Sequence, residues 1–305
     1  MVWRIVALIM AAVLACVCLA ESGPESGHVY VENEWNFVEG AMDIAGGIPE
    51  DAAGVLGAIR EAGVLRVGTE PYFPPQEFID PALRGQDQYV GSDMELARRI
   101  AQRMGVALEI IPMEFTHVLD AVAEGECDLV ISALAYVPDR ASRVTLSKGY
   151  HFSEGGVSSG LLIRAADAGT ITDLSGLDGL NIAAQSGSLQ EALAAQNITG
   201  YREFRRPYAM QAVYDAVAGG LADAAVVDVE SALAYIETNP EKSLALVEGV
   251  QFSLEPQFDG DRVAAKKGEL QLMYFVNGVI DEILAAGEYR KWYDEYEAYA
   301  GVLGM

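Results

Sequence analysis

The sequence is poor in basic residues. Its 305 residues include 45 Asp and Glu but only 20 Lys and Arg, which gives a formal net charge of -25 at pH 7. A chain of this charge repels both nucleic-acid backbones and anionic lipid surfaces. We therefore expect no nucleic-acid partner.

Cysteine and histidine are also scarce. Two of the three cysteines fall within the first 20 residues, so only Cys127 remains for the folded part and no intramolecular disulfide is available. We expect Cys127 to be a buried small hydrophobe rather than a nucleophile. The three histidines, His28, His117 and His151, are scattered without metal-ligand spacing. The sequence thus indicates no metal and no cofactor.

Residues 1–20 carry an apolar run that is too short for an ordinary membrane span. Arg4 precedes this run, small residues end it, and the chain then turns polar. This pattern predicts an export signal, so we expect the protein to leave the cytoplasm. The ending "VLAC" at Cys16 resembles a lipobox, and we favour a lipoprotein anchored to the membrane through several acyl chains on Cys16. Leu14 is bulky for that motif, and ordinary cleavage after Ala20 is the alternative.

The rest of the chain is long enough for two domains, and 51% of all residues are hydrophobic. Residues 21–50 read as a tether and an acidic N-terminal extension, in which we expect Trp35 and Phe37 to pack onto the body. Strand-like and helical patterns then alternate, as in 65–68, 92–105, 107–113, 115–125 and 127–134. We expect Ser92 or Asp93 to cap the helix over 92–105. The alternation predicts a parallel sheet flanked by helices.

The same alternation restarts near residue 177. Two segments also echo each other, "AVAEGECDLVIS" from Ala121 and "AVAGGLADAAVVD" from Ala216. We interpret the chain as two similar α/β lobes, although a helix, a glycine and a buried strand follow one another in many α/β proteins. Between two such patterns, "LRVGTEPYFPPQEF" predicts a rigid turn that displays Glu70, Tyr72 and Phe73 as one wall of a pocket.

Eight stretches in order resemble the bacterial extracellular solute-binding proteins of family 3, the polar amino-acid receptors of ABC importers. They are "LRVGTEPYFPP", "YVGSDMELARRIAQRMG", "IIPMEF", "GECDLVISAL", "PDRASRVTLSKGY", "LDGLNIAAQSGSLQEA", "ADAAVVD" and "EYRKWYDEY". The resemblance implies an α/β fold of the type II periplasmic-binding-protein kind, with two lobes, each a mainly parallel sheet flanked by helices, and a ligand cleft between them. It places lobe 1 at residues 51–157 and 253–305 and lobe 2 at 158–252, with crossovers near 155–161 and 250–254.

The resemblance also implies a binding site. Arg140 matches the arginine that clamps a ligand α-carboxylate, for which its planar fork is suited; the alternative is a surface ion pair with Asp139. Gly187, Ser188 and Leu189 match a helix start that meets the same carboxylate, or they form a plain capped helix. Asp228 matches the acid that receives the α-ammonium, or it is only a helix cap.

Further residues complete the implied site. Phe73 and Phe115 match two aromatic positions around the ligand side chain, Glu70 matches an acid at its polar tip, and Ser132 belongs to the same site. These residues favour a basic or amide side chain over an acidic one, although buried aromatics often serve only as core. The chain departs from the family pattern at Ala133 and Ala135, since Ala135 lacks the hydroxyl that helps to bind the ammonium. The carbonyl of Ala133 remains available as an acceptor.

These features favour a monomeric, non-enzymatic receptor that captures a small polar or basic amino acid and delivers it to an ABC transporter permease. The alternative is an enzyme on the same fold that resembles cyclohexadienyl dehydratase, with Glu70 as the general acid. A third possibility is a sensor that signals through a separate protein.

Overall fold

The protein is described here from a computed structural model, over residues 29–153 and 157–305. The predicted export signal, Cys16, the first part of the tether and the start of the first predicted crossover, at Gly155, lie outside the described residues. Over the described ranges, no helix combines the length and the apolar character that a membrane span requires.

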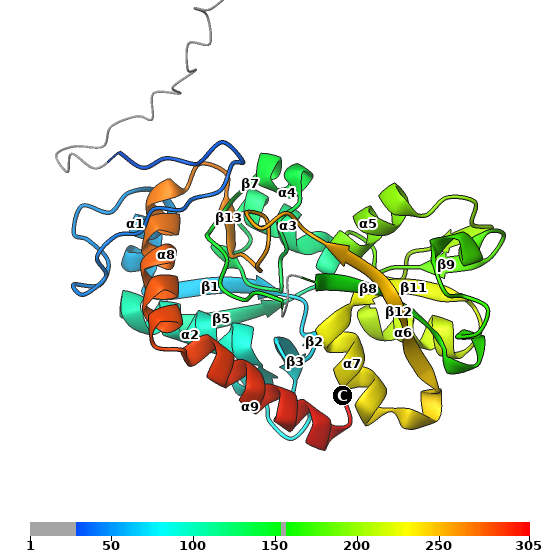
Figure 1. The fold of residues 1–305 in the computed structure, drawn as a ribbon. Helices are drawn as coiled ribbons and strands as arrows, with labels where there is room; N and C mark the ends of the chain where they lie inside the picture. Colours follow the sequence, from blue (N-terminus) through cyan, green and yellow to red (C-terminus); the bar gives the residue numbers. More distant parts are fainter. Residues whose placement is uncertain (1–28, 154–156) are drawn as a thin grey trace, which may run out of the picture.

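The first of two large sheets has the strand order β5-β1-β6-β13-β7. Its strands are β1 (Val64–Thr69), β5 (Ala107–Pro112), β6 (Leu129–Val130), β7 (Val144–Leu146) and β13 (Ala264–Lys266). β1 pairs in parallel with β5 and β6, whereas β13 runs antiparallel to both of its neighbours, β6 and β7. The reversed strand is the one that follows the return of the chain from the second sheet (Figure 1).

The second sheet repeats this plan with the order β10-β9-β11-β8-β12. Its strands are β8 (Val157–Arg164), β9 (Asn181–Ala183), β10 (Glu203–Arg205), β11 (Ala224–Asp228) and β12 (Leu244–Ser253). Here β8, the first strand to enter the sheet, is antiparallel to β11 and β12, while β9 is parallel to β10 and β11. The prediction of two similar, mainly parallel α/β lobes is therefore confirmed.

Helices cover both sheets (Figure 1). The first sheet is flanked by α1 (Gly54–Ala62), α2 (Ser92–Met104), α3 (Val118–Glu124), α4 (Pro138–Arg143), α8 (Leu270–Ala285) and α9 (Glu288–Leu303), and the second by α5 (Leu189–Asn197), α6 (Met210–Ala218) and α7 (Val229–Thr238). Short 3₁₀ turns lie at Gly85–Gln88, Phe115–His117, Ala165–Asp167, Leu174–Leu177 and Pro240–Lys242. The small hairpin sheet of β2 (Tyr72–Phe73), β3 (Glu77–Ile79) and β4 (Tyr89–Val90) lies between the two large sheets in the ribbon view.

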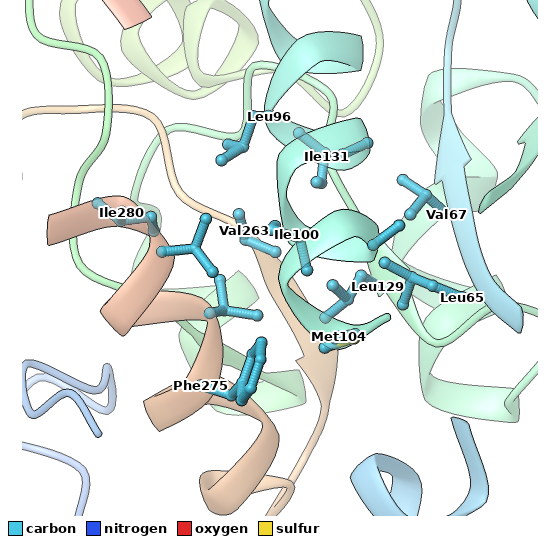
Figure 2. Packing of buried hydrophobic residues seen from close by; sticks show 14 of the residues in the cluster. Leu65, Val67, Leu96, Ile100, Met104, Leu129, Ile131, Val263, Phe275 and Ile280 are labelled. Atoms are coloured by element: carbon cyan, nitrogen blue, oxygen red, sulfur yellow. The ribbon is translucent and has the colours of Figure 1, made fainter. Parts of the chain in front are cut away.

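One large apolar core joins the first sheet to the last helices. Leu65 and Val67 from β1 pack with Ile100 from α2 and with Phe275 and Ile280 from α8 (Figure 2). Alternate residues of β1 point to this side of the sheet, and α2 and α8 each present an apolar stripe to it. Residues more than 200 positions apart thus share one core, which ties the end of the chain to the lobe in which it began. Cys127, in the cluster on the opposite face, is buried as predicted.

The predicted cap of α2 is wrong. The N-cap position is Gly91, with φ of 124°, and a Cβ there would lie only 2.1 Å from the Gln76 carbonyl oxygen. The close approach of the hairpin therefore requires glycine at this position. Asp93 instead points into the protein, where its carboxylate accepts hydrogen bonds from the Tyr150 and Tyr289 hydroxyls at 2.8 and 2.6 Å.

The N-terminal extension packs onto the first lobe, as predicted for Trp35 and Phe37. The Val38 amide donates to the Leu146 carbonyl at 2.8 Å, so the extension lies beside the edge strand β7. The Asn277 side-chain amide holds the extension from α8 by donating to the carbonyls of Val38 and Gly40, each at 2.8 Å. Phe37 is buried, with 3% of its surface exposed.

Candidate functional site

A cavity between the two sheets gathers the sequence-predicted site residues. Ten of them line it: Glu70, Phe73, Phe115, Ser132, Ala133, Ala135, Arg140, Ser188, Leu189 and Asp228. Gly187 does not line it, and Tyr72, which was predicted to belong to the same pocket wall as Glu70 and Phe73, is exposed and lies outside this lining. Sequence reasoning missed further polar lining residues, namely Gln76, Glu77, His151, Gln185, Gln190, Asp259 and Asp261. The cavity measures about 60 Å³, so the lobes are closed around it in this structure.

Arg140 lies near the start of α4 with its guanidinium turned into the cavity. It is 4% exposed, and it donates to the Ala135 carbonyl and, across the cleft, to the Gly187 carbonyl, each at 2.8 Å. Burial lowers the pKa of Arg140 to about 10, against which the charges of Asp261 and Asp139 act, so the side chain remains a cation at neutral pH. The described residues place no carboxylate within ion-pair distance of it. A buried cation that meets only carbonyls is suited to an incoming anion.

The start of α5 approaches Arg140 from the second lobe. Ser188 caps this helix by accepting from the Glu191 amide at 3.0 Å, while the Glu191 carboxylate accepts from the Gly187 amide at 2.7 Å. The Gly187 amide is therefore not free in this structure, because the side chain at the third helical position reaches back to it. A ligand carboxylate has to displace Glu191 to use this amide.

Glu70 directly follows β1 and lines the same cavity as Arg140. It is 3% exposed; its amide donates to the Ser132 hydroxyl at 3.0 Å, and one carboxyl oxygen accepts from Gln185 of the second lobe at 3.4 Å. Burial raises the pKa of Glu70 to about 8, and the hydrogen bond from Gln185 acts in the opposite direction. Phe73 and Phe115, both half-buried, also line the cavity, and Arg140 lies 5.4 Å from the Phe115 ring centre.

A second buried carboxyl group lies behind Glu70. Ser132 donates its hydroxyl to Glu77 at 3.1 Å, and Glu77 is buried beside Asp93. Burial, the Asp93 charge and the Glu70 charge all raise the pKa of Glu77 well above its usual range, so we assign the proton to Glu77. Burial also raises the pKa of Asp93, but the hydrogen bonds that two tyrosine hydroxyls and the Ala133 amide donate to it act in the opposite direction.

Two aspartates approach the cavity from different lobes. Asp228, at the end of β11, accepts from the Ser231 amide at 2.8 Å and thus caps α7, so the helix-cap interpretation is correct whatever else Asp228 does. Asp261 accepts from the Gln76 side chain at 2.8 Å. Burial raises the pKa of both groups, to about 7 for Asp261, while the nearby His151 lowers both.

His151 is the one basic side chain besides Arg140 within the described cavity lining, and it lies beside these aspartates. Its Nε2 lies 3.3 Å from the Glu230 carboxylate, and its ring stacks on Tyr293 with centroids 4.5 Å apart. Burial lowers the pKa of His151, but the hydrogen bond with Glu230 and the charge of Asp261 outweigh it and the pKa is raised. Because Glu230 belongs to the second lobe, this ion pair is another bond across the cleft. This pair could not be predicted from sequence patterns, because 79 residues separate the partners.

Comparison with known proteins identifies relatives of this chain. A family model described as bacterial extracellular solute-binding proteins, family 3, matches residues 65–298. The L-cystine-binding protein TcyJ of Escherichia coli K12 is 27% identical over 245 residues, which cover 79% of this chain and 86% of that protein.

Solved structures have the same two-lobe fold. The amino acid ABC transporter substrate-binding protein AbpA of Streptococcus pneumoniae Canada MDR_19A, bound to L-arginine, matches with a TM-score of 0.71 and 29% identity over 79% of this chain and 98% of that one. The ancestral amino acid-binding protein AncCDT-1, a precursor of cyclohexadienyl dehydratase, matches with a TM-score of 0.68 and 24% identity over 80% and 99% of the two chains. At 24% identity, the similarity to AncCDT-1 indicates a shared fold alone.

Proposed function

Because the chain belongs to family 3 of the bacterial extracellular solute-binding proteins, we propose that its cleft captures an α-amino acid with a basic or amide side chain for the permease of an ABC importer. The buried Arg140 carries this proposal. A charged fork that bonds only to carbonyls, in a cleft whose lining also includes five acidic residues, selects a ligand with one carboxylate and at least one cationic group. The acids are Glu70, Glu77, Asp228, Asp259 and Asp261. On binding, the ligand carboxylate takes the place of the Gly187 carbonyl, which now accepts from Arg140 at 2.8 Å.

The ammonium group of the ligand is assigned to Asp228 and Asp261. Ala135 offers no hydroxyl, but its neighbour in the isolated strand pairing is Asp261, which brings a carboxylate to the same region. Asp228 lies across the cleft from Asp261, and repulsion from the Asp228 charge helps to raise the pKa of Asp261. A ligand cation between them relieves this repulsion and favours the closed state.

The ligand side chain is assigned to the space beside Glu70. Phe73 and Phe115 supply aromatic faces, which attract a cation as well as an apolar stem. The cavity of about 60 Å³ is smaller than an amino acid, so ligand entry requires the lobes to move apart about the strands that connect them. We place the lobe boundaries at 157/158 and 252/253, where the chain enters and leaves the second sheet.

Several attributes of the mature protein belong to the same proposal. Export follows from membership of an extracellular family, and we propose lipidation at Cys16 with the protein tethered to the membrane as a monomer. Mass determination of the exported protein tests the anchor: acylation at Cys16 removes residues 1–15 and adds the mass of the acyl groups, whereas cleavage after Ala20 leaves an unmodified chain.

A ligand panel tests the proposed function. The domain from Glu21 onward is unfolded and refolded to remove carried-over ligand, then heated with L-arginine, L-histidine, L-glutamine, L-cystine or L-glutamate. A ligand at about a hundred times its dissociation constant adds roughly 2.7 kcal/mol of stability, which raises Tm by several degrees. We expect a shift with basic or amide amino acids and none with L-glutamate. A shift with L-glutamate alone would contradict the assignment of Glu70.

One observation favours a second candidate function. The pKa of about 8 leaves the Glu70 carboxyl protonated at neutral pH, as a general acid requires. A dehydratase acting on prephenate or arogenate uses such an acid in a closed cleft. Incubation with either compound and detection of the aromatic product tests this candidate: measurable turnover that Glu70→Gln abolishes supports it, and absence of product removes it.

A further inference from the structure

The N-terminal extension carries an aromatic turn at residues 33–37, upstream of the family match over 65–298. The Asn33 side chain closes this turn by accepting from the amides of Trp35 and Phe37 at 3.0 and 3.2 Å. Asn36 adopts a positive φ of 61°, which asparagine tolerates better than most residues. As a result the rings of Trp35 and Phe37 stack, with centroids 6.1 Å apart. We call residues 33–37 the aromatic turn.

The aromatic turn contacts two segments that line the ligand cavity. The Trp35 carbonyl accepts from the Tyr136 hydroxyl at 3.2 Å, next to the cavity residue Ala135. Tyr136 stacks on Phe258 with ring centres 4.4 Å apart, and Trp35 meets Phe258 edge-on at 5.9 Å. Phe258 directly precedes Asp259, which lines the cavity. The turn therefore packs behind the cavity wall and connects the two wall segments that contain Ala135 and Asp259.

Arg262 links the aromatic turn to Asp261. Its guanidinium lies 4.0 Å from the centre of the Phe37 ring and donates to the carbonyls of Ser147 and Gln257 at 2.9 and 3.1 Å. It is 3% exposed, and the described residues offer it no carboxylate within ion-pair distance, so these carbonyl oxygens and the Phe37 face together meet its charge. Adjacent residues of an extended segment point to opposite sides. Arg262 thus faces the extension while Asp261 faces the ligand.

We propose that the aromatic turn positions the Asp261 carboxylate through Arg262 and thereby helps to determine selectivity for the ligand's ammonium group. This inference rests on the proposed function, in which Asp261 receives that ammonium. Phe37 and Arg262 act as positioning residues, because neither lines the cavity. The extension, which lies outside the family match, accordingly supports the binding site from behind without lining it.

A double-mutant cycle tests the inference. Phe37→Leu keeps most of the buried volume but removes the aromatic face, and Asp261→Asn removes the charge that the face positions. Affinities for L-arginine and for 5-guanidinopentanoate, the same molecule without the α-ammonium, are measured by calorimetry. We expect Phe37→Leu to weaken L-arginine binding by about tenfold, the scale of a desolvated cation-π contact, and to change binding of the analogue by less than about twofold.

The cycle has two outcomes that overturn the inference. Equal weakening of both ligands by Phe37→Leu indicates a general loss of structure, and additivity of the two substitutions indicates that Phe37 does not act through Asp261. The expected result is that Phe37→Leu has no further effect once Asp261 is Asn. Glu32→Gln is the matched control, because Glu32 lies in the same extension but pairs with Lys267 and Thr145. We expect this variant to bind L-arginine as the parent does.

Amide hydrogen exchange provides a readout that needs no ligand, so failure of the proposed function does not mask the result. The Asp261 amide donates to the His151 carbonyl at 2.9 Å and the Arg262 amide to the Leu134 carbonyl at 2.8 Å. Phe37→Leu is expected to speed exchange at these two amides by about tenfold or more while leaving β1 unchanged, and Glu32→Gln is expected to do neither. Unchanged exchange at Asp261 and Arg262 in Phe37→Leu would refute the positioning role.

Discussion

Replacing Arg140 with alanine is expected to weaken amino-acid binding by about two to three orders of magnitude. Truncating one partner of a buried, hydrogen-bonded charge pair typically costs about 2–5 kcal/mol, because the other charge stays buried without its partner. In the complex that other charge is the ligand carboxylate. In the free protein Arg140 bonds only to the carbonyls of Ala135 and Gly187, so the substitution leaves no buried charge without its partner. Calorimetry with L-arginine, or with whichever amino acid gives the largest thermal shift, measures the loss.

Two further variants make this prediction specific. Arg143 lies on the same short helix, but it is 43% exposed and pairs with Asp120 at the surface, so Arg143→Ala is expected to leave affinity within about threefold. Arg140→Lys keeps the charge but loses the planar fork, and an intermediate loss is expected. Equal affinities for Arg140→Ala and the parent protein would show that the ligand carboxylate binds elsewhere.

Affinity for L-arginine is expected to rise with pH between about pH 6 and pH 8, by up to tenfold per pH unit. Burial raises the pKa of Glu70 to about 8, so the free carboxyl is mostly protonated at the lower end of this range. A guanidinium beside Glu70 favours the carboxylate, so binding releases a proton, and the release ends above about pH 8. Calorimetry at pH 7 in buffers of different ionisation enthalpy counts the released protons.

The same shift has a consequence for folding. The pKa of Glu70 is higher in the folded than in the unfolded chain, so its contribution to stability is complete below about pH 4.3 and is lost as pH rises towards 8.

Asp261, with a pKa raised to about 7, titrates in the same pH window and also lines the ligand cavity. Two variants distinguish the contributions of Glu70 and Asp261. Glu70→Gln is expected to remove most of the pH dependence of the affinity for L-arginine, whereas Asp261→Asn is expected to remove a smaller part. An affinity that is flat from pH 6 to 8 in the parent protein would contradict the role of Glu70.

The two-lobe fold was predictable because it depends on local patterns repeated along the chain. Alternating strands and amphipathic helices determine each sheet, and each sheet has one strand, β13 or β8, that is antiparallel to both of its neighbours. The exception at Gly91 is instructive. A cap was expected from Ser92 or Asp93 by residue type, yet the capping position depends on how closely the hairpin approaches, and residue type does not reveal that distance.

The candidate site was predictable where residues lie in recognisable motifs and not elsewhere. Arg140, Glu70 and Asp228 stand in stretches that resemble the family, and they line one cavity. Asp261 and His151 have no such signal, because they reach the cavity through strand pairings between distant segments. Trp35 and Phe37 were expected to pack on the body, but their position behind Asp261 depends on the edge of β7 and on Arg262. Such contacts form between segments that are distant in the sequence, so the spacing of residues along the chain does not predict them.

The decisive measurement is a crystal structure of the domain with the amino acid that gives the largest thermal shift. We expect the ligand carboxylate to accept two hydrogen bonds from Arg140 in place of the Gly187 carbonyl, with the ligand ammonium between Asp228 and Asp261 and the ligand side chain beside Glu70. A ligand bound with its ammonium remote from both aspartates, or with its carboxylate away from Arg140, would contradict it.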